Sequence, residues 1–442
     1  MLFLTPHKAR FWIGQGGAIA LLLLTVACGS ETPTAGESTT TATVSPTAAT
    51  ADGALKLGTL LPITGDLAQY GTTMQDSADL LIQTVNACQG ALGKPVELVS
   101  EDDQTSPTAG AAGMTKLVEV DKVAGVIGAA GSAVSMAAVD IAVRNQVVQI
   151  SPSSTSPDFT TRAQKGDFKG FWFRTAPPDT FQGDALAQLA KQQGFQKVAI
   201  LAINNDYGNG LIQSFVPAFK GQGGAVVNES SPTKYAPDAT TFDSELSAAF
   251  SGEPDAVLLI AYPETGSLVL KSAFEQGLLG GKTKILLSDG MKTDKLAELV
   301  GKADGKFIAA GVVGTAPGAG GPAIAQFTTA YKTQFKRDPN VYDPNTYDAA
   351  AVLVLAAEAA KANTGAAVKD KIGEVANAPG EAVSDVCKAL ELVRQGQDID
   401  YQGASGMIDF NAQGDVVGVY DVWTIADDGK LQVTSKIDVG GS

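Results

Sequence analysis

The chain has 442 residues, and its 47 Asp and Glu against 32 Lys and Arg give a formal net charge of −15 at pH 7. A surface this acidic argues against binding to nucleic acid, whose phosphates need basic patches, and against docking on anionic lipid. The length suits two domains of ordinary size, and a hydrophobic content of 44% suits a globular protein with a sizeable core.

The first 53 residues predict export and attachment to a membrane. A short basic start precedes an apolar run over 11–26, which is short for a membrane-spanning helix, and small residues follow it. The stretch around Cys28 resembles a bacterial lipoprotein signal, in which the cysteine is acylated; cleavage without lipid is the alternative. We predict a signal peptide over 1–27 and a lipid-anchored, disordered stalk over 28–53, which is rich in Thr, Ala, Ser and Pro.

The rest of the chain alternates short apolar runs with helical patterns, which predicts parallel sheets with helices on both faces. In a first unit we expect strands at 55–61, 96–100, 125–128 and 147–150, and helices at 75–86, 109–120 and 133–144. In a second unit we expect strands at 198–203, 225–228, 256–260 and 284–287, and helices at 208–220, 242–250, 265–276 and 293–300. The remainder predicts a strand beginning within 307–313, helices at 324–335 and 346–361, a weaker helical region to 394, and strands at 416–425 and 431–437.

Polar side chains gather in the turns that follow the predicted strands, where ligands bind in open α/β sheets. In the first unit the turn 151–157 is dense in hydroxyls and is fixed by two prolines, and the helix starts near it suit a carboxylate. The second unit contributes acids and phenols suited to an ammonium group: Asp206, Tyr207, Tyr262, Glu264 and Asp289. Asp206 and Glu264 have helix capping as an alternative role. The two walls together predict a site for a small zwitterion.

Catalysis is poorly supported by the sequence. The only histidine, His7, lies in the predicted signal peptide, so the mature chain has neither a Ser–His–acid triad nor a histidine metal site. The glycine-rich stretch 277–283 lacks the spacing of a phosphate-binding loop. We therefore expect no enzyme activity, no cofactor and no metal.

Two cysteines remain if Cys28 carries lipid. In an exported protein, Cys88 and Cys387 are compatible with one disulfide, and two separate buried thiols are the alternative.

Several short stretches, in this order, resemble a known family: 60–65 with 70–71, 101–103, 151–157, 206–210, 261–264 and 406–410. The family is the branched-chain amino-acid (Leu/Ile/Val-type) solute-binding proteins of ABC importers, which have the type I periplasmic-binding-protein fold. The resemblance implies an α/β protein of two doubly wound parallel-sheet lobes joined by a three-crossover hinge. Lobe 1 would comprise 54–176 plus 313–418, and lobe 2 would comprise 177–312 plus 419–442.

The resemblance also implies a ligand site between the lobes. Ser132, Ser153 and Thr155 match residues that hold the α-carboxylate and α-amino groups of the ligand, and Tyr70 matches a ring beside its side chain. In lobe 2, Tyr207 and Tyr262 match residues that close over the ligand. Asp289 matches an acidic partner of the ammonium group, where the family often has the longer glutamate.

The resemblance implies a lipid-anchored substrate-binding protein of an ABC transporter, of the leucine-binding type. Its two lobes would close over the ligand like a Venus flytrap. It would be a monomer in the periplasm or at the cell surface, would capture a small neutral amino acid, and would deliver it to the permease subunits in the membrane. Binding or sensing of amides or urea on the same fold is the alternative.

Overall fold

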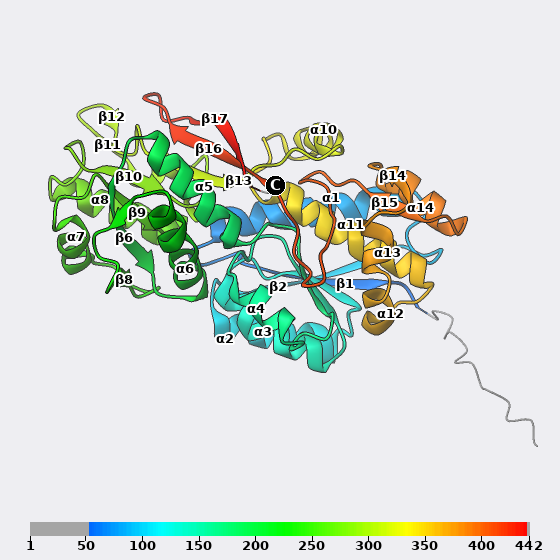
Figure 1. Ribbon diagram of the computed structural model, residues 1–442. Coiled ribbons are helices and arrows are strands. Elements are labelled where there is room, and N and C mark those ends of the chain that lie inside the picture. The colour runs from blue at the N-terminus through cyan, green and yellow to red at the C-terminus, as the bar shows by residue number, and fades with distance from the viewer. Residues whose placement is uncertain (1–52, 440–442) are drawn as a thin grey trace, which may run out of the picture. The chain divides into compact units, whose positions relative to one another are not determined.

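The computed structural model describes residues 53–439 (Figure 1). The predicted signal peptide, Cys28 and the predicted stalk up to residue 52 lie outside the described residues. Within 53–439, no helix is both long enough and apolar enough to cross a membrane.

Lobe 1 is built on a five-stranded sheet in which every neighbouring pair is parallel. Its order is β2-β1-β3-β4-β5, with bounds β1 Lys56–Leu61, β2 Glu97–Asp102, β3 Gly125–Gly128, β4 Val148–Ser151 and β5 Trp172–Arg174. Leu60 pairs with Gly128, and Ile127 pairs with Ile150. The register therefore brings the turns after β1, β3 and β4 to one edge of the sheet.

The helices of lobe 1 connect these parallel strands, as a doubly wound sheet requires. They are α1 Ala68–Ala87, α2 Pro107–Thr115 with a π-helical turn Lys116–Val120, α3 Ser132–Arg144 and α4 Asp158–Gln164. Gly71 allows α1 to pack close to the turn that precedes it, because a Cβ at this position would lie 1.9 Å from the Pro62 carbonyl oxygen. This close approach sets the position of the neighbouring Tyr70.

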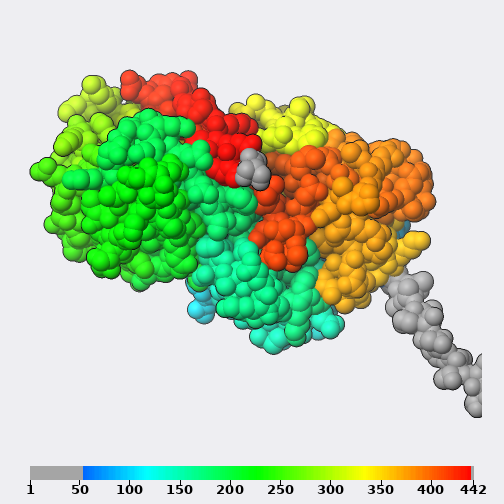
Figure 2. Space-filling view, viewed as in Figure 1, coloured from blue at the N-terminus to red at the C-terminus, as the bar shows by residue number. Residues whose placement is uncertain are grey.

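Lobe 2 has a larger sheet that is parallel in its centre and antiparallel at one edge. The order is β7-β6-β9-β10-β13-β16-β17, and β8 also pairs with β6. The strands are β6 Lys197–Ile203, β7 Ala225–Val226, β8 Thr233–Tyr235, β9 Ala256–Ile260, β10 Lys284–Leu287, β13 Val313–Pro317, β16 Val419–Ile425 and β17 Leu431–Asp438. The β16–β17 hairpin (red in Figure 2) belongs to lobe 2. Its strand β16 pairs with β13, although the two strands are far apart in the sequence.

The helices and short elements of lobe 2 flank this sheet. They are α5 Asp179–Gln192, α6 Asp206–Gly221, α7 Asp243–Phe250, α8 Pro263–Glu275, a 3-10 turn Asp289–Met291, α9 Leu296–Val300, β11 Lys302–Ala303 and β12 Lys306–Phe307. We did not predict α5 or β8, and α9 is shorter than the helix expected at 293–300.

The chain then returns to lobe 1. The returning elements are α10 Ile324–Phe335, α11 Asp343–Ala360, α12 Gly365–Lys369, α13 Ile372–Ala376, β14 Glu381–Val383, α14 Val386–Arg394 and β15 Ile399–Tyr401. Helix α11 (yellow in Figure 1) packs along α1 and contacts β3 and β4. Its nearly continuous burial from Asp343 to Ala357 makes it the centre of the lobe 1 core.

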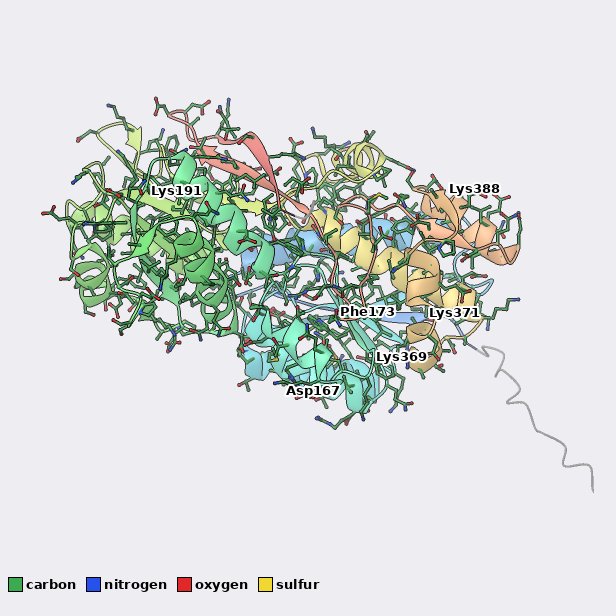
Figure 3. All side chains as sticks on the ribbon, in the orientation of Figure 1. Asp167, Phe173, Lys191, Lys369, Lys371 and Lys388 are labelled. Atoms are coloured by element: carbon green, nitrogen blue, oxygen red, sulfur yellow. A yellow bond between two sulfur atoms is a disulfide. The ribbon has the colours of Figure 1, made fainter. Side chains whose placement is uncertain are left out.

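One predicted domain boundary is wrong. The boundary at 313 placed β13 in lobe 1, but β13 pairs with β10 and β16 in the sheet of lobe 2. The second crossing between lobes therefore follows Pro317. The first lies between β5 and α5, and the third precedes β16. Phe173, labelled in Figure 3, follows Trp172 on β5. Its ring packs edge-on against that of Phe410, beside the third crossing, with 5.1 Å between ring centroids.

Cys88, at the end of α1, and Cys387, in the first turn of α14, form a disulfide with their Cα atoms 5.8 Å apart. The structure thus pairs the two cysteines, as we expected, and excludes the alternative of separate thiols. The bridge ties the first helix of lobe 1 to the segment that returns after lobe 2.

Candidate functional site

The hydroxyl-rich turn after β4 forms the first wall of the site. The Ser151 hydroxyl donates to the Ala129 carbonyl at 2.6 Å and accepts the Ser154 N–H at 2.9 Å. Ser153 donates to the Ala130 carbonyl at 3.1 Å. The turn therefore uses several of its hydroxyls to hold the neighbouring turn after β3, and Ser153 lies at the surface of the cavity described below.

A buried arginine that we did not predict supports this turn from behind. Arg174, the last residue of β5, donates to the carbonyl groups of Ser154 and Ser156 at 3.1 and 2.9 Å. Its Nε donates to Asp415 Oδ1 at 2.6 Å, and both side chains are almost fully buried. Since Asp415 lies just before the third crossing, this ion pair fixes the turn relative to the hinge.

The start of α3 completes the first wall. Its N-cap residue is Gly131, which has no side chain to cap the first N–H groups of the helix. Ser132 follows, and its Oγ accepts the Ser156 N–H at 3.3 Å. Both residues line the cavity. Uncapped N–H groups, a serine hydroxyl and the positive end of a 13-residue helix make this wall suitable for a carboxylate.

The second wall comes from the turns of lobe 2. Ala202 pairs with Ile260, and Leu259 pairs with Leu287, so the turns after β6, β9 and β10 meet at one edge. They present Tyr207 in the first turn of α6, Tyr262 at the N-cap of α8, and Asp289 in the 3-10 turn after β10. The two tyrosine rings stack with 5.4 Å between their centroids.

Asp289 is held by tyrosine hydroxyls on both carboxylate oxygens. Tyr207 donates to Oδ1 at 2.6 Å, and Tyr342, just before α11, donates to Oδ2 through a short contact. Tyr70 donates to the carbonyl oxygen of Gly290 at 3.2 Å. The ring of Tyr70 meets that of Tyr342 edge-on at 5.9 Å. We did not predict Tyr342, because it lies on the returning segment rather than in a turn after a strand.

A second buried carboxylate stands near Asp289. Asp179, at the start of α5, is fully buried, and among residues 53–439 its carboxylate has no hydrogen-bond partner apart from the nearby Thr155 hydroxyl. Its backbone N–H donates to the Thr155 carbonyl at 2.8 Å, which places Thr155 beside it. The Thr155 hydroxyl is also buried, and within the described part of the chain it has no partner other than the neighbouring Asp179 carboxylate. An ammonium group could satisfy both side chains.

The pKa shifts of Asp179 and Asp289 are consistent with a cationic partner. Burial raises the pKa of Asp179 well above its usual range and the nearby charge of Asp289 raises it further, while the Thr155 hydroxyl and the charge of Arg174 counteract part of this rise. Burial also raises the pKa of Asp289, and the hydrogen bonds from Tyr207 and Tyr342 counteract part of that effect. Two buried carboxyl groups this close favour a shared positive partner, which would lower both pKa values.

These walls enclose one cavity, which six of the seven predicted ligand-binding residues line. The lining residues are Leu67, Tyr70, Met74, Ala130, Gly131, Ser132, Ser153, Tyr207, Tyr262, Asp289, Gly290 and Tyr342. The seventh predicted residue, Thr155, is buried behind the cavity next to Asp179. The enclosed space is about 20 Å³, room for about one water molecule. An amino acid can enter only if the walls separate or the tyrosines move.

The other two acids weighed as site residues, Glu264 and Asp206, do not line the cavity. Glu264 accepts from the side chain of Gln69 at 3.0 Å and does not line the cavity. Asp206 lies in the first turn of α6, where Asn205 acts as the N-cap by accepting the Gly208 N–H at 2.9 Å. Over residues 53–439 no three His, Cys, Asp or Glu side chains are grouped so that they could hold a metal ion.

Two α/β lobes with facing polar turns and a cavity between them define the class of type I periplasmic binding proteins, which bind solutes and are not enzymes. A family model described as the receptor family ligand binding region matches residues 73–428, and the chain belongs to that family.

Similar proteins agree with this class. The substrate-binding protein BasB of a chemotactic signal transduction system in Halobacterium salinarum is 26% identical over 84% of this chain and 87% of its own length. A Leu/Ile/Val-binding protein homologue of Brucella abortus is 28% identical over 70% of this chain and 79% of that protein. The crystal structure of a leucine-binding protein LivK from Thermotoga maritima has a TM-score of 0.72 at 26% identity, and covers 87% of this chain and 99% of that one. The predicted resemblance is thereby confirmed.

Proposed function

We propose that the protein is an extracytoplasmic substrate-binding lipoprotein of an ABC importer. It captures a small neutral amino acid between its lobes and delivers it to the permease subunits in the membrane. The single observation that carries this proposal is the chemistry of the two walls. Ser132, Ser153 and the uncapped start of α3 line the cavity on one side, Asp289 lines it on the other, and Asp179 is buried next to Thr155.

The wall chemistry supports a zwitterion. The carboxylate of the ligand would lie at Ser132, Ser153 and the start of α3, where donors and helix charge favour an anion. Its ammonium group would lie between Asp289 and the pair formed by Thr155 and Asp179. A buried carboxylate without a partner is costly, so a cationic group there is stabilised by charge and by hydrogen bonds.

The remaining cavity surface supports an uncharged side chain on the ligand. Leu67, Met74 and Ala130 are apolar, and the rings of Tyr70 and Tyr342 lie beside them. None of the described residues that line the cavity is cationic, and Asp289 is assigned to the ammonium group, so a charged side chain would be buried here without a further partner of opposite charge. A neutral aliphatic side chain would instead gain from the removal of apolar surface from water.

Other proteins of the same fold bind aromatic acids. A solute-binding protein of Rhodopseudomonas palustris, crystallised with benzoate, is 20% identical with a TM-score of 0.69, which indicates a shared fold. Benzoate has no ammonium group, so it would leave Asp179 and Asp289 without a cationic partner. The acid pair therefore favours an amino acid over benzoate.

Amides or urea are the second candidate ligands. Their N–H groups can donate to Asp179 and Asp289, although they carry no positive charge to offset two buried carboxylates. They also lack the carboxylate that suits the start of α3. If the ligand is an amide or urea, the protein should bind that compound in the absence of any free amino acid.

A thermal-shift screen tests the proposal. The soluble part of the chain would be melted with each free amino acid, urea, short amides and benzoate, because a ligand that binds only the folded state stabilises it by mass action. We expect a neutral amino acid to give the largest rise in melting temperature. A rise with benzoate or urea, and none with any amino acid, would contradict the proposal.

The anchoring part of the proposal concerns Cys28, which would carry lipid and hold the protein at the outer side of a membrane. Mass spectrometry of the mature protein from its natural host would find an acylated Cys28 as the first residue. A mature chain that begins after residue 28 and carries no lipid would exclude the lipoprotein assignment.

A further inference from the structure

The turn between β1 and α1 of lobe 1 contacts α8 of lobe 2, and Leu67 in this turn lines the cavity. Asp66, in this turn, accepts two hydrogen bonds from one residue of α8. Its Oδ1 accepts the Thr265 N–H at 2.8 Å, and its Oδ2 accepts the Thr265 hydroxyl at 2.6 Å. Three residues further on, Gln69 donates to Glu264 at 3.0 Å. We call these four side chains the clasp: Asp66, Gln69, Glu264 and Thr265.

Asp66 acts as an N-cap for a helix of the other lobe. The N-cap position of α8 is Tyr262, whose side chain makes no capping hydrogen bond, and Pro263 follows it. Thr265 is the third residue of the helix, and its N–H is one that a capping side chain normally accepts. A carboxylate at a helix start is also stabilised by the positive end of the helix. Lobe 1 therefore provides the cap that the sequence of α8 lacks.

The capped end of α8 is part of the ligand site. Tyr262 precedes the first turn of α8 and lines the cavity, where its ring stacks on Tyr207. When Asp66 fixes this turn against lobe 1, it also fixes Tyr262 over the cavity. If the lobes separate, Asp66 moves away from Thr265, and water takes its place at the start of α8.

We infer that Asp66 is a positioning residue, which holds the lobes closed over the ligand and so sets affinity and release rate without touching the ligand. The inference rests on the proposed function, because it concerns closure of the same site. The clasp itself requires only that Asp66 and Thr265 are hydrogen-bonded in the closed protein, so it can be tested with any ligand that closes the lobes.

Three variants test the inference. Asp66→Ala removes the cap, whereas Asp66→Asn keeps a capping oxygen, since Asn and Asp cap helices about equally well. Asp255→Ala is the matched control, because Asp255 accepts two backbone N–H groups, at Gln196 and Lys197, entirely within lobe 2. Calorimetric titration and stopped-flow release would use L-leucine as the probe.

We expect Asp66→Ala to weaken leucine binding by about 2- to 30-fold, the range for loss of a helix cap. Release should speed up by a similar factor, because the clasp forms after the ligand has entered. Asp66→Asn should stay within about threefold of wild type, and Asp255→Ala should lower the melting temperature without a change in affinity. Equal affinities of Asp66→Ala and wild type would overturn the inference.

Hydrogen exchange of the closed protein separates failure of the clasp from failure of the proposed function. Wild type and Asp66→Ala would each be saturated with L-leucine, benzoate or urea, whichever raises the melting temperature in the thermal-shift screen. The peptide that covers residues 262–268 should then exchange slowly in wild type and faster in Asp66→Ala, while the end of α8 is unaffected. If the difference appears with benzoate or urea and no amino acid binds, the proposed function fails and the clasp stands. If the peptide exchanges equally in both saturated proteins, the clasp is wrong whatever the ligand is.

Discussion

At the scale of single residues, Asp289 is the side chain on which ligand binding should depend most. It would be the charged partner of the ligand's ammonium group, and breaking a buried charge pair typically costs roughly 3–5 kcal/mol. Asp289→Ala should therefore weaken amino-acid binding by roughly two to nearly four orders of magnitude. Thr155→Val should cost less, about 1–3 kcal/mol, because it removes a single hydrogen bond. Calorimetric titration of the folded variants checks both values.

Asp289 also binds Tyr207 and Tyr342, so its loss could act on the fold alone. In that event, the melting temperature of Asp289→Ala would fall while the variant still bound its ligand within threefold of wild type. Such a result would show that the ammonium partner lies elsewhere. Asp179 would then be the next residue to replace.

A second residue-scale prediction concerns stability and pH. Burial raises the pKa of Asp103 to about 7, and Oδ2 of this side chain has no hydrogen-bond partner among residues 53–439. From about pH 4 to pH 7 the unfolded chain has lost a proton that the folded protein keeps, so the free energy of unfolding falls as pH rises through this window. Above pH 7 Asp103 is ionised in both states, and the buried charge lowers the free energy of unfolding by its full cost, at most roughly 4 kcal/mol.

Asp103→Asn should remove this cost, because Asn cannot ionise and its oxygen can still accept the Thr105 N–H, as Oδ1 of Asp103 does at 2.8 Å. Urea unfolding at pH 4 and pH 8 measures the effect. The variant should be more stable than wild type at pH 8 and nearly equal to it at pH 4. A stability difference that is the same at both pH values would show that Asp103 ionises normally in the folded protein.

At the scale of elements, the close packing of α6 against the turn after β4 limits how closely the two lobes can approach each other. A Cβ on Gly210 would lie 2.6 Å from Pro157 Cδ and 2.8 Å from Ser156 Oγ, both in lobe 1. Gly210→Ala should oppose closure at a cost of about 1–3 kcal/mol, which weakens ligand binding by about 5- to 150-fold. The open form should not suffer, because Ala favours a helix over Gly.

Gly221→Ala is the control for this experiment, since it makes the same change at the end of the same helix with no atom within 4 Å of the new Cβ. Titration and small-angle scattering with ligand would compare the two variants. Gly210→Ala should keep a larger radius of gyration at the ligand concentration that closes wild type. If both variants bind and close alike, α6 does not restrict closure.

The disulfide is the second element-scale prediction. It joins α1 to α14 across 299 residues of sequence, so its removal should destabilise the protein by roughly 5 kcal/mol through the greater chain entropy of the unfolded state. Denaturant unfolding of Cys88→Ala/Cys387→Ala against wild type measures this difference. Thiol labelling of the unreduced, denatured protein should find neither cysteine free, and labelling of both would refute the pairing.

The elements that the sequence predicted well are those whose pattern is local. The strands at 125–128, 256–260 and 284–287 were predicted with the bounds that the structure has, because each is a short apolar run between turn residues. The assignment of β13 failed because pairing with β10 and β16 is a long-range property. No local pattern shows which sheet a strand joins.

The same distinction applies to the site. Asp289 and the turn 151–157 follow strands, and the rule that ligands bind at the carboxyl ends of parallel strands pointed to them, whereas Ser132 and Ser153 were named from the family resemblance. Asp179, Arg174 and Tyr342 lie in or beside the crossings between lobes. Their partners are far away in sequence, so only the folded chain brings them to the cavity. The run 175–179, with prolines before an acid, was the one local hint of a helix start there.

At the scale of the whole molecule, the central claim is that the two lobes grip opposite ends of one zwitterion. The start of α3 with Ser132 and Ser153 in lobe 1 would hold the carboxylate, and Asp289 with the neighbouring Asp179 and Thr155 would hold the ammonium group. Both acids of this site come from lobe 2. Full affinity should therefore require that both charged groups are present on one ligand.

One set of calorimetric titrations tests this claim most directly. The ligands are L-leucine, 4-methylpentanoate, which lacks the amino group, and 3-methylbutylamine, which lacks the carboxylate. We expect leucine to bind and each analogue to bind at least about 100-fold more weakly, because each leaves a buried polar wall unmatched. Binding of either analogue as tightly as leucine would contradict the account.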